Sequence, residues 1–184
     1  LAVDGERTDL GSLNLTERGT QGLTTMVAPK DASLNDVSDI EEHAVETEQA
    51  TLNEQVVLKL ETTGLQHLFK DASPSDFDEG NSIYNQGVRL SMEQTEQQVN
   101  NSTGELTIGS SDAFLDTDEY DELEEGVYYF VFDASSASGI DEEDTYEASF
   151  EIQNQFEYYN DDDYDDDEVR EEATDELTFY EEEV

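Results

Sequence analysis

Apolar and polar side chains alternate in several short stretches of the chain, which predicts β-strands with one buried face. Residues 55–61 are the clearest case, because Val56, Leu58 and Leu60 fall on one side and Lys59 falls on the other. The alternation recurs at residues 23–27, 88–92, 106–108, 145–156 and 177–180. Six or seven short strands separated by turn residues predict an all-β protein.

Residues 126–133 are the densest apolar stretch and carry large side chains on both faces. One face holds Tyr128, Phe130 and Phe132. The other face holds Tyr129 with Val127 and Val131. This pattern predicts a central strand that is buried on both sides. We interpret the Tyr129 face as covered by the fold, with an exposed partner surface as the alternative.

Two short helical segments are also predicted. Ser38 and Glu41 have the spacing of a capping box, with Ser38 as the N-cap. The buried stripe of this helix would consist of Ile40, Ala44 and Val45. A second helical turn is indicated by apolar residues at positions i, i+3 and i+4, namely Leu65, Leu68 and Phe69.

Together these elements predict an immunoglobulin-like β-sandwich with one or two short helical turns and an acidic C-terminal loop. Residues 1–21 are polar and are interpreted as an N-terminal arm or lead-in. Residues 22–184 would form the sandwich, with an acidic insertion at 157–176. The Cys and Trp residues that mark many such domains are absent, so the strand topology stays open.

The charge balance excludes several classes of partner. The 184 residues include 50 Asp and Glu against 7 Lys and Arg, a formal net charge of −43. Binding to nucleic acid phosphates needs basic side chains, so nucleic acid and anionic membrane surfaces are excluded as partners. No apolar run approaches the ~18 residues that would cross a bilayer. The lack of cysteine excludes disulfides and thiol chemistry.

So acidic a chain is either disordered or adapted to concentrated salt. Self-repulsion would strain a compact fold in dilute buffer, whereas at about 1 M salt the Debye length falls to about 3 Å. The apolar pattern above and the 9 Tyr and 8 Phe residues argue against disorder. We therefore favour a folded protein that works in brine.

Several segments then resemble a known family. Residues 44–47, 55–60 and 63–65 are similar to the immunoglobulin-like ectodomains of haloarchaeal secreted and surface-layer-type glycoproteins. In that pattern an aromatic strand like 126–133 and a strand like 147–150 follow. The resemblance implies an extracellular β-sandwich without enzymatic activity, often found in tandem arrays or cell-surface assemblies.

One acidic run is a candidate metal site. Calcium takes six to eight oxygen ligands, which clustered carboxylates can supply. The candidate ligands are Asp161, Asp162, Asp163, Asp165, Asp166, Asp167 and Glu168. A complete EF-hand loop is missing from the sequence, so a solvated loop holding diffuse cations is the simpler interpretation and calcium is the only cofactor considered.

Two asparagines are candidate glycan acceptors. Asn14 and Asn101 each begin an Asn-x-Ser/Thr triplet. Turn formation alone also explains the polar segment around Asn101. Glycosylation at either position would require that the protein is exported.

No catalytic group is predicted. His43 and His67 are the two histidines, and a hydrolytic triad would need one of them between a carboxylate and a nucleophile. The Gly-x-Ser-x-Gly motif of many hydrolases is absent from the sequence. We expect structural roles for both histidines and a protein that is not an enzyme.

These observations favour a structural module of a halophilic archaeal cell surface or extracellular filament. Its expected partners are further copies of itself or neighbouring surface proteins, and residues 1–15 or 176–184 could add a strand to a neighbour's sheet. A calcium-dependent adhesin that binds a ligand or carbohydrate is one alternative. A structural protein of a halophilic virus is another, and a secreted hydrolase comes last.

Overall fold

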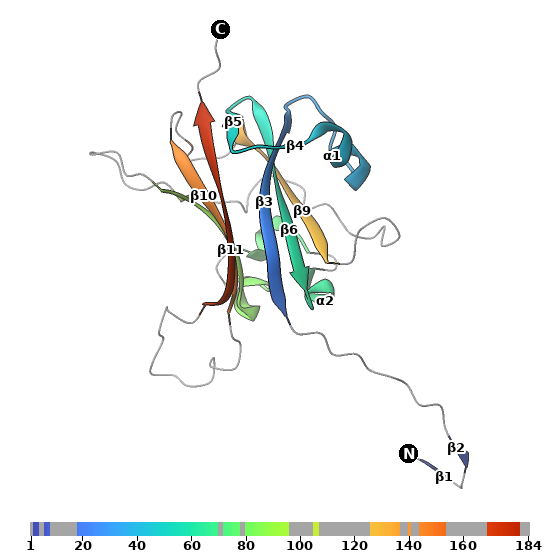
Figure 1. The fold of residues 1–184 in the computed structure, drawn as a ribbon. Coiled ribbons are helices and arrows are strands. Elements are labelled where there is room, and N and C mark those ends of the chain that lie inside the picture. The colour runs from blue at the N-terminus through green and yellow to red at the C-terminus, as the bar shows by residue number, and fades with distance from the viewer. Residues whose placement is uncertain are drawn as a thin grey trace, which may run out of the picture.

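The computed structural model describes residues 2–3, 6–7, 18–69, 72–77, 80–95, 105–106, 126–136, 140, 144–153 and 169–180. In this part of the chain, two β-sheets face each other as a sandwich (Figure 1). Short helices and 3₁₀ turns connect some of the strands. This architecture confirms the prediction of an all-β sandwich, whereas its immunoglobulin-like topology stays a prediction.

The four-stranded sheet has the order β4 (Val45–Glu46), β3 (Gly19–Pro29), β6 (Glu54–Thr63) and β9 (Val127–Asp133). The five-stranded sheet has the order β5 (Gln49–Thr51), β11 (Val169–Tyr180), β10 (Thr145–Gln153), β7 (Val88–Gln94) and β8 (Glu105–Leu106). The pairing of β5 with β11 is parallel, and the other pairings within these two sheets are antiparallel.

The remaining elements are short. Near the N-terminus, β1 (Ala2–Val3) pairs with β2 (Glu6–Arg7). The helices are α1 (Val37–His43) and α2 (Gln66–Phe69). The 3₁₀ turns are η1 (Pro74–Phe77), η2 (Tyr84–Gln86) and η3 (Ala134–Ser136).

The main core lies between the two sheets and confirms the predicted alternation. Val56, Leu58 and Leu60 of β6 are fully buried. The inward residues of β10 that face them from the other sheet are Tyr146, Ala148, Phe150 and Ile152, all at most 1% exposed. Apolar burial at this density is the main source of stability for the sandwich.

The predicted helical turn at Leu65–Phe69 is confirmed as α2, and it closes one end of the core. Leu65 and Phe69 are buried, and the amide of Phe69 donates to the carbonyl of Leu65 at 3.0 Å. The Phe69 ring meets Tyr128 edge to face, with ring centres 4.7 Å apart. Such an aromatic pair adds to the burial energy of its two rings.

A second apolar cluster covers the outer face of the four-stranded sheet. Its buried members are Ala28, Leu34, Ile40, Val57, Tyr129 and Val131. Helix α1 and the segment before it supply the cover, and α1 lies beside β3 and β4 in Figure 1. The Tyr129 face is therefore covered by the fold, as we expected, rather than an open interface.

The prediction that residues 126–133 form a central strand is wrong. Strand β9 is buried on both faces but lies at the edge of the four-stranded sheet as the described residues define it. Apolar residues on both faces report burial from above and below the sheet. They carry no information about how many strands lie to either side.

Helix α1 also differs from its prediction. Its N-cap is Asp36, not Ser38, and the Asp36 carboxylate accepts from the amide of Asp39 at 2.9 Å. The carboxylate of Asp39 in turn accepts from the amide of Asn35 at 3.0 Å, so a reciprocal cap forms two residues earlier than expected.

Only one residue of the predicted helical stripe is fully buried. Ile40 is 0% exposed, whereas Ala44 is already extended and Val45 is 67% exposed in β4. The helix ends at His43 because the chain extends there to pair with β3.

The predicted acidic insertion at 157–176 is partly wrong, because β11 begins at Val169. Residues 176–180 consequently belong to a strand within the sheet, and Leu177 and Phe179 are fully buried. The proposed role of 176–184 as a detached strand for a neighbour's sheet therefore fails for 176–180. At the other end of the domain, β3 begins at Gly19.

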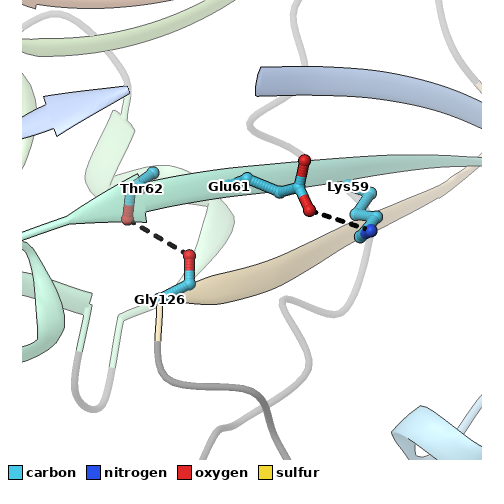
Figure 2. A network of polar contacts seen from close by, with 4 residues as sticks. All are labelled: Lys59, Glu61, Thr62 and Gly126. Carbon is cyan, nitrogen blue, oxygen red and sulfur yellow. Dashed lines mark hydrogen bonds and ion pairs between the residues drawn. The ribbon is translucent and has the colours of Figure 1, made fainter. Parts of the chain in front are cut away.

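A close backbone approach fixes the start of β9 against the end of β6. Gly126 has a φ of 97°, and the amide of Thr62 donates to its carbonyl at 2.8 Å. A Cβ at Gly126 would collide with the carbonyl oxygen of Thr62, so glycine is required there. Figure 2 shows a second bond, from the hydroxyl of Thr62 to the carbonyl of Gly126 at 3.5 Å. It lies beside the Lys59–Glu61 ion pair on the outer side of β6, where Nζ and Oε1 are 3.1 Å apart.

Candidate functional site

The candidate sites chosen from sequence fall outside the described residues. The acidic run 161–168 and the two asparagines Asn14 and Asn101 all lie there, so calcium binding and glycosylation stay predictions. Within the described ranges, no three His, Cys, Asp or Glu side chains gather closely enough to hold a metal ion.

The two histidines lie at the surface of two separate short helices. His43 is exposed at the end of α1, where its Nδ1 bonds the carbonyl oxygen of Asp39 at 2.9 Å. This contact places the imidazole at the C-terminal end of a helix, where a basic group is favourable. His67 is exposed on α2. Neither position suggests a catalytic role.

The outer face of the five-stranded sheet carries rows of carboxylates in register. Glu147 of β10 lies opposite Glu93 on β7 and Glu176 on β11. Two rows along the same face, Glu151 lies between Arg89 and Glu172. Like charges directly opposite each other destabilise a sheet, so this face needs counterions from the solvent.

Burial and the charge of this face together shift the pKa of one carboxyl. Burial, followed by the charge of Glu172, raises the pKa of Glu151 above its usual value, while Arg89 acts in the opposite direction. The guanidinium of Arg89 also lies 4.7 Å from the ring centre of Tyr84, a cation–π contact. One basic residue thus sits against several acids.

Two other acids of β11 point away from this face and reach the opposite sheet. The amide of Thr20 donates to Glu171 Oε2 at 2.7 Å, and the amide of Thr25 donates to Asp175 Oδ2 at 2.6 Å. We call this pair of hydrogen bonds the carboxylate seam. It joins β3 of one sheet to β11 of the other, and the two strands lie side by side in Figure 1.

Local sequence explains how the carboxylate seam forms. Alternation along β11 puts Glu171, Ala173, Asp175, Leu177 and Phe179 on the side that faces the other sheet. The last two of these enter the core, whereas the two acids meet the edge of β3. Gly19 permits the approach of Glu171, because a Cβ there would lie 2.8 Å from Oε2 of that side chain.

The segment from β4 to β5 closes the rest of the same edge of the sandwich. It pairs with β3 at Val45–Glu46 and with β11 at Gln49–Thr51, so it crosses from one sheet to the other. The amide of Thr47 donates to the backbone carbonyl of Thr25 at 3.3 Å, and the amide of Thr178 donates to the backbone carbonyl of Glu48 at 2.9 Å. Both sheets are therefore tied together along their β3 and β11 sides.

An open cleft lies at this crossing, with a volume of about 520 Å³. Its lining residues are Thr25, Glu46, Thr47, Glu48, Gln49 and Asp175. Three of them are acidic, yet in the described part of the chain they do not meet the geometry of a metal site. The cleft is therefore a negatively charged surface.

Sequence reasoning missed the carboxylate seam because Glu171 and Asp175 stood inside a run interpreted as a solvated loop. The signal that could have found them is their spacing. They continue the period of two that leads to Leu177 and Phe179, which marks them as inward positions of a strand.

The fold and the seam define an acidic two-sheet module whose first and last long strands are tied by carboxylates. The chain is 29% identical over 160 residues to a cell surface glycoprotein from Haloferax gibbonsii. The match covers 83% of this chain and 18% of that protein, so the chain spans less than a fifth of its relative. No family model matches the chain, and no solved structure matches it.

This similarity supports a relation to surface glycoproteins of halophilic archaea, as the sequence predicted. It leaves the immunoglobulin-like part of that prediction untested. Within the described residues, no helix has the length and apolar character needed to cross a bilayer.

Proposed function

We propose that the chain is a non-catalytic structural module in a longer extracellular protein at the surface of a halophilic archaeon. The observation that carries the proposal is its similarity, over most of its length, to a small part of a cell surface glycoprotein. The described fold agrees with such a role, since its apolar residues are committed to two packed clusters.

The distribution of charge supports brine as the working solvent. The outer row of Glu93, Glu147 and Glu176 places three carboxylates next to one another across three strands. In dilute buffer their repulsion opposes folding, whereas at about 1 M salt it is screened beyond about 3 Å. The same carboxylates keep the surface hydrated in concentrated salt.

The path of the chain supports a place within a tandem array. Strand β3 begins at one end of the sandwich and β11 finishes at the opposite end (Figure 1). A preceding and a following module can therefore attach at opposite ends without crossing the sheets. As the last part of the proposal, cations bridge carboxylates on adjacent modules and so hold the modules together.

The solvent part of the proposal is tested by thermal unfolding of the purified chain, followed by circular dichroism from dilute buffer to near-saturated NaCl. We expect a cooperative loss of β signal whose midpoint rises steeply with salt. A midpoint that stays constant from dilute buffer upward would contradict the proposal. CaCl₂ at matched ionic strength separates screening from cation bridging, because bridging alone adds a shift or causes association.

The location is tested separately by immunogold labelling of intact cells that express the full-length protein. We expect gold particles on the outer surface of unpermeabilised cells. Labelling that requires permeabilisation would overturn the surface role while leaving the adaptation to salt intact.

A further inference from the structure

The carboxylate seam shows that β3 and β11 run in the same direction. Thr20 contacts Glu171 and Thr25 contacts Asp175, so both contacts advance together along the two strands. The start of β3 at Gly19 therefore lies beside the start of β11. Tyr180, where β11 finishes, lies about 30 Å further along at the usual rise per residue.

This arrangement determines how tension would act on the domain. A pull between neighbouring modules draws the start of β3 toward one end and the finish of β11 toward the other. Hydrogen bonds between antiparallel strands lie perpendicular to the strands, so this pull shears them together. The loaded contacts are the β3–β6 ladder, the β10–β11 ladder and the carboxylate seam.

We propose that the domain bears tension along its strands, with Glu171 and Asp175 preventing β3 and β11 from sliding past each other. This inference rests on the proposed function as one module of a longer surface protein. It gives these two acids a mechanical role between the two sheets, whereas the outward acids of the same strand face away from β3.

The chemistry of the seam suits this role. A carboxylate that accepts from a backbone amide forms a hydrogen bond that is shorter and stronger than one between neutral groups. Thr25 is fully buried and Asp175 is half-buried, so salt screens their contact less than it screens the outer glutamates. The bond therefore persists in the brine that weakens other charge interactions.

The position of the seam also matters. In the described residues, β4 holds β3 at Met26 and Val27, near the end where β11 finishes. The seam adds one contact at Thr25, next to Met26, and a second at Thr20, near the end where the chain enters the sandwich. Without it, residues 19–24 of β3 lose their described hydrogen bond to the other sheet.

The test is single-molecule pulling of the full chain between handles at its two ends, in concentrated NaCl. Glu171→Ala/Asp175→Ala is compared with Glu147→Ala/Glu176→Ala, which removes the same charge from the outer face of the same sheet. We expect the seam variant to unfold about tenfold or more faster at constant force, since one charge-assisted hydrogen bond is worth that factor. The control variant should match the parent.

A second pulling geometry identifies the seam as the cause. Because the chain has no cysteine, Lys30→Cys gives one attachment point just after β3, near the end where β11 finishes. A pull between this point and the C-terminus does not slide β3 against β11. In this geometry the seam variant and the parent should unfold at the same rate.

Equal rates for the seam and control variants under end-to-end pulling would overturn the proposal, as would an equal loss in both geometries. If the double alanine variant gives no folded β signal, Glu171→Gln/Asp175→Asn replaces it. The introduced Gln and Asn side chains keep an acceptor oxygen but carry no charge. We therefore expect this variant to unfold faster than the parent and more slowly than the double alanine variant. An unfolding rate equal to that of the parent would contradict the proposed role of the seam. Pulling uses the isolated chain, so its outcome is independent of the immunogold result.

Discussion

The two sheets of the sandwich have opposite outer faces. On the four-stranded sheet, Tyr129 and Val131 belong to a second apolar cluster that includes Ile40 of α1. On the five-stranded sheet, the outer face carries Glu147 and Glu151 in register with further acids. One sheet therefore buries both faces, whereas the other buries one and exposes a charged face to solvent.

This difference separates two sources of stability in one domain. Burial of the helix-covered face depends on apolar area and is present at any salt concentration where the chain folds. The carboxylate face contributes repulsion that only salt removes. The changes in stability caused by variants on the two faces should consequently differ in their dependence on salt as well as in their magnitude.

The largest effect is expected on the helix-covered face. Ile40→Ala removes a fully buried side chain and should lower the free energy of unfolding by about 3 kcal/mol, the usual cost of such a cavity. Urea unfolding at constant high salt measures it. Val45→Ala is the matched control, since that side chain is 67% exposed and the expected change is below about 0.5 kcal/mol. Equal losses for both variants would show that α1 does not cover the sheet.

The next effect has the opposite sign and lies on the carboxylate face. Glu147→Gln removes the middle charge of the Glu93–Glu147–Glu176 row and should stabilise the protein by about 1 kcal/mol at low salt. The gain should disappear near 1 M salt, where the Debye length is about 3 Å. The measured quantity is the salt concentration at which half of the molecules are folded.

Glu41→Gln serves as the control for this experiment, because Glu41 is an exposed residue of α1 that lies outside the row. It removes the same charge from the chain. If it lowers the salt requirement as much as Glu147→Gln does, net charge matters and the row does not.

Strands were predictable wherever apolar residues alternate, as in Val56, Leu58 and Leu60. There the pattern itself states which face is buried. The N-cap of α1 was not predictable, because Asp36 and Ser38 are both good N-cap residues. The choice depends on where the extended backbone stops, and Asp36 is the residue with extended angles of −148° and 175°.

The candidate site was less predictable than the fold. An acid on an inward position of a strand looks, in sequence, like an acid in a solvated loop. Glu171 and Asp175 take their role from amides of β3, about 150 residues earlier in the chain. A single sequence holds no information on that pairing, and the same limit left β9 wrongly placed at the centre of its sheet.

A smaller effect should follow from Glu151, whose pKa burial and Glu172 raise above its ordinary value of 4.5. A raised pKa in the folded state means that the protonated form is favoured. Its contribution is therefore full below the unfolded value and is lost as the pH rises through the folded value. Glu151→Gln mimics the protonated form and should gain about 0.5 kcal/mol near neutral pH, a size that allows for solvent screening.

Urea unfolding of parent and variant near neutral pH and again below the unfolded pKa measures this difference. The gain should shrink toward zero at the lower pH, because the parent carboxyl is then protonated as well. A gain that is the same at both pH values would assign the effect to packing instead of charge.

The smallest effect is expected from the ion pair on the four-stranded sheet. Lys59 and Glu61 are partly exposed, at 31% and 39%, and screening in brine leaves such a pair little energy. Lys59→Met keeps the aliphatic stem and should change the free energy of unfolding by less than about 0.5 kcal/mol at high salt. A loss above about 1 kcal/mol in urea unfolding would show that this pair is more than a screened surface contact. The helix-covered sheet would then depend on charge as well as on burial, and the contrast between the two faces would be smaller than their composition suggests.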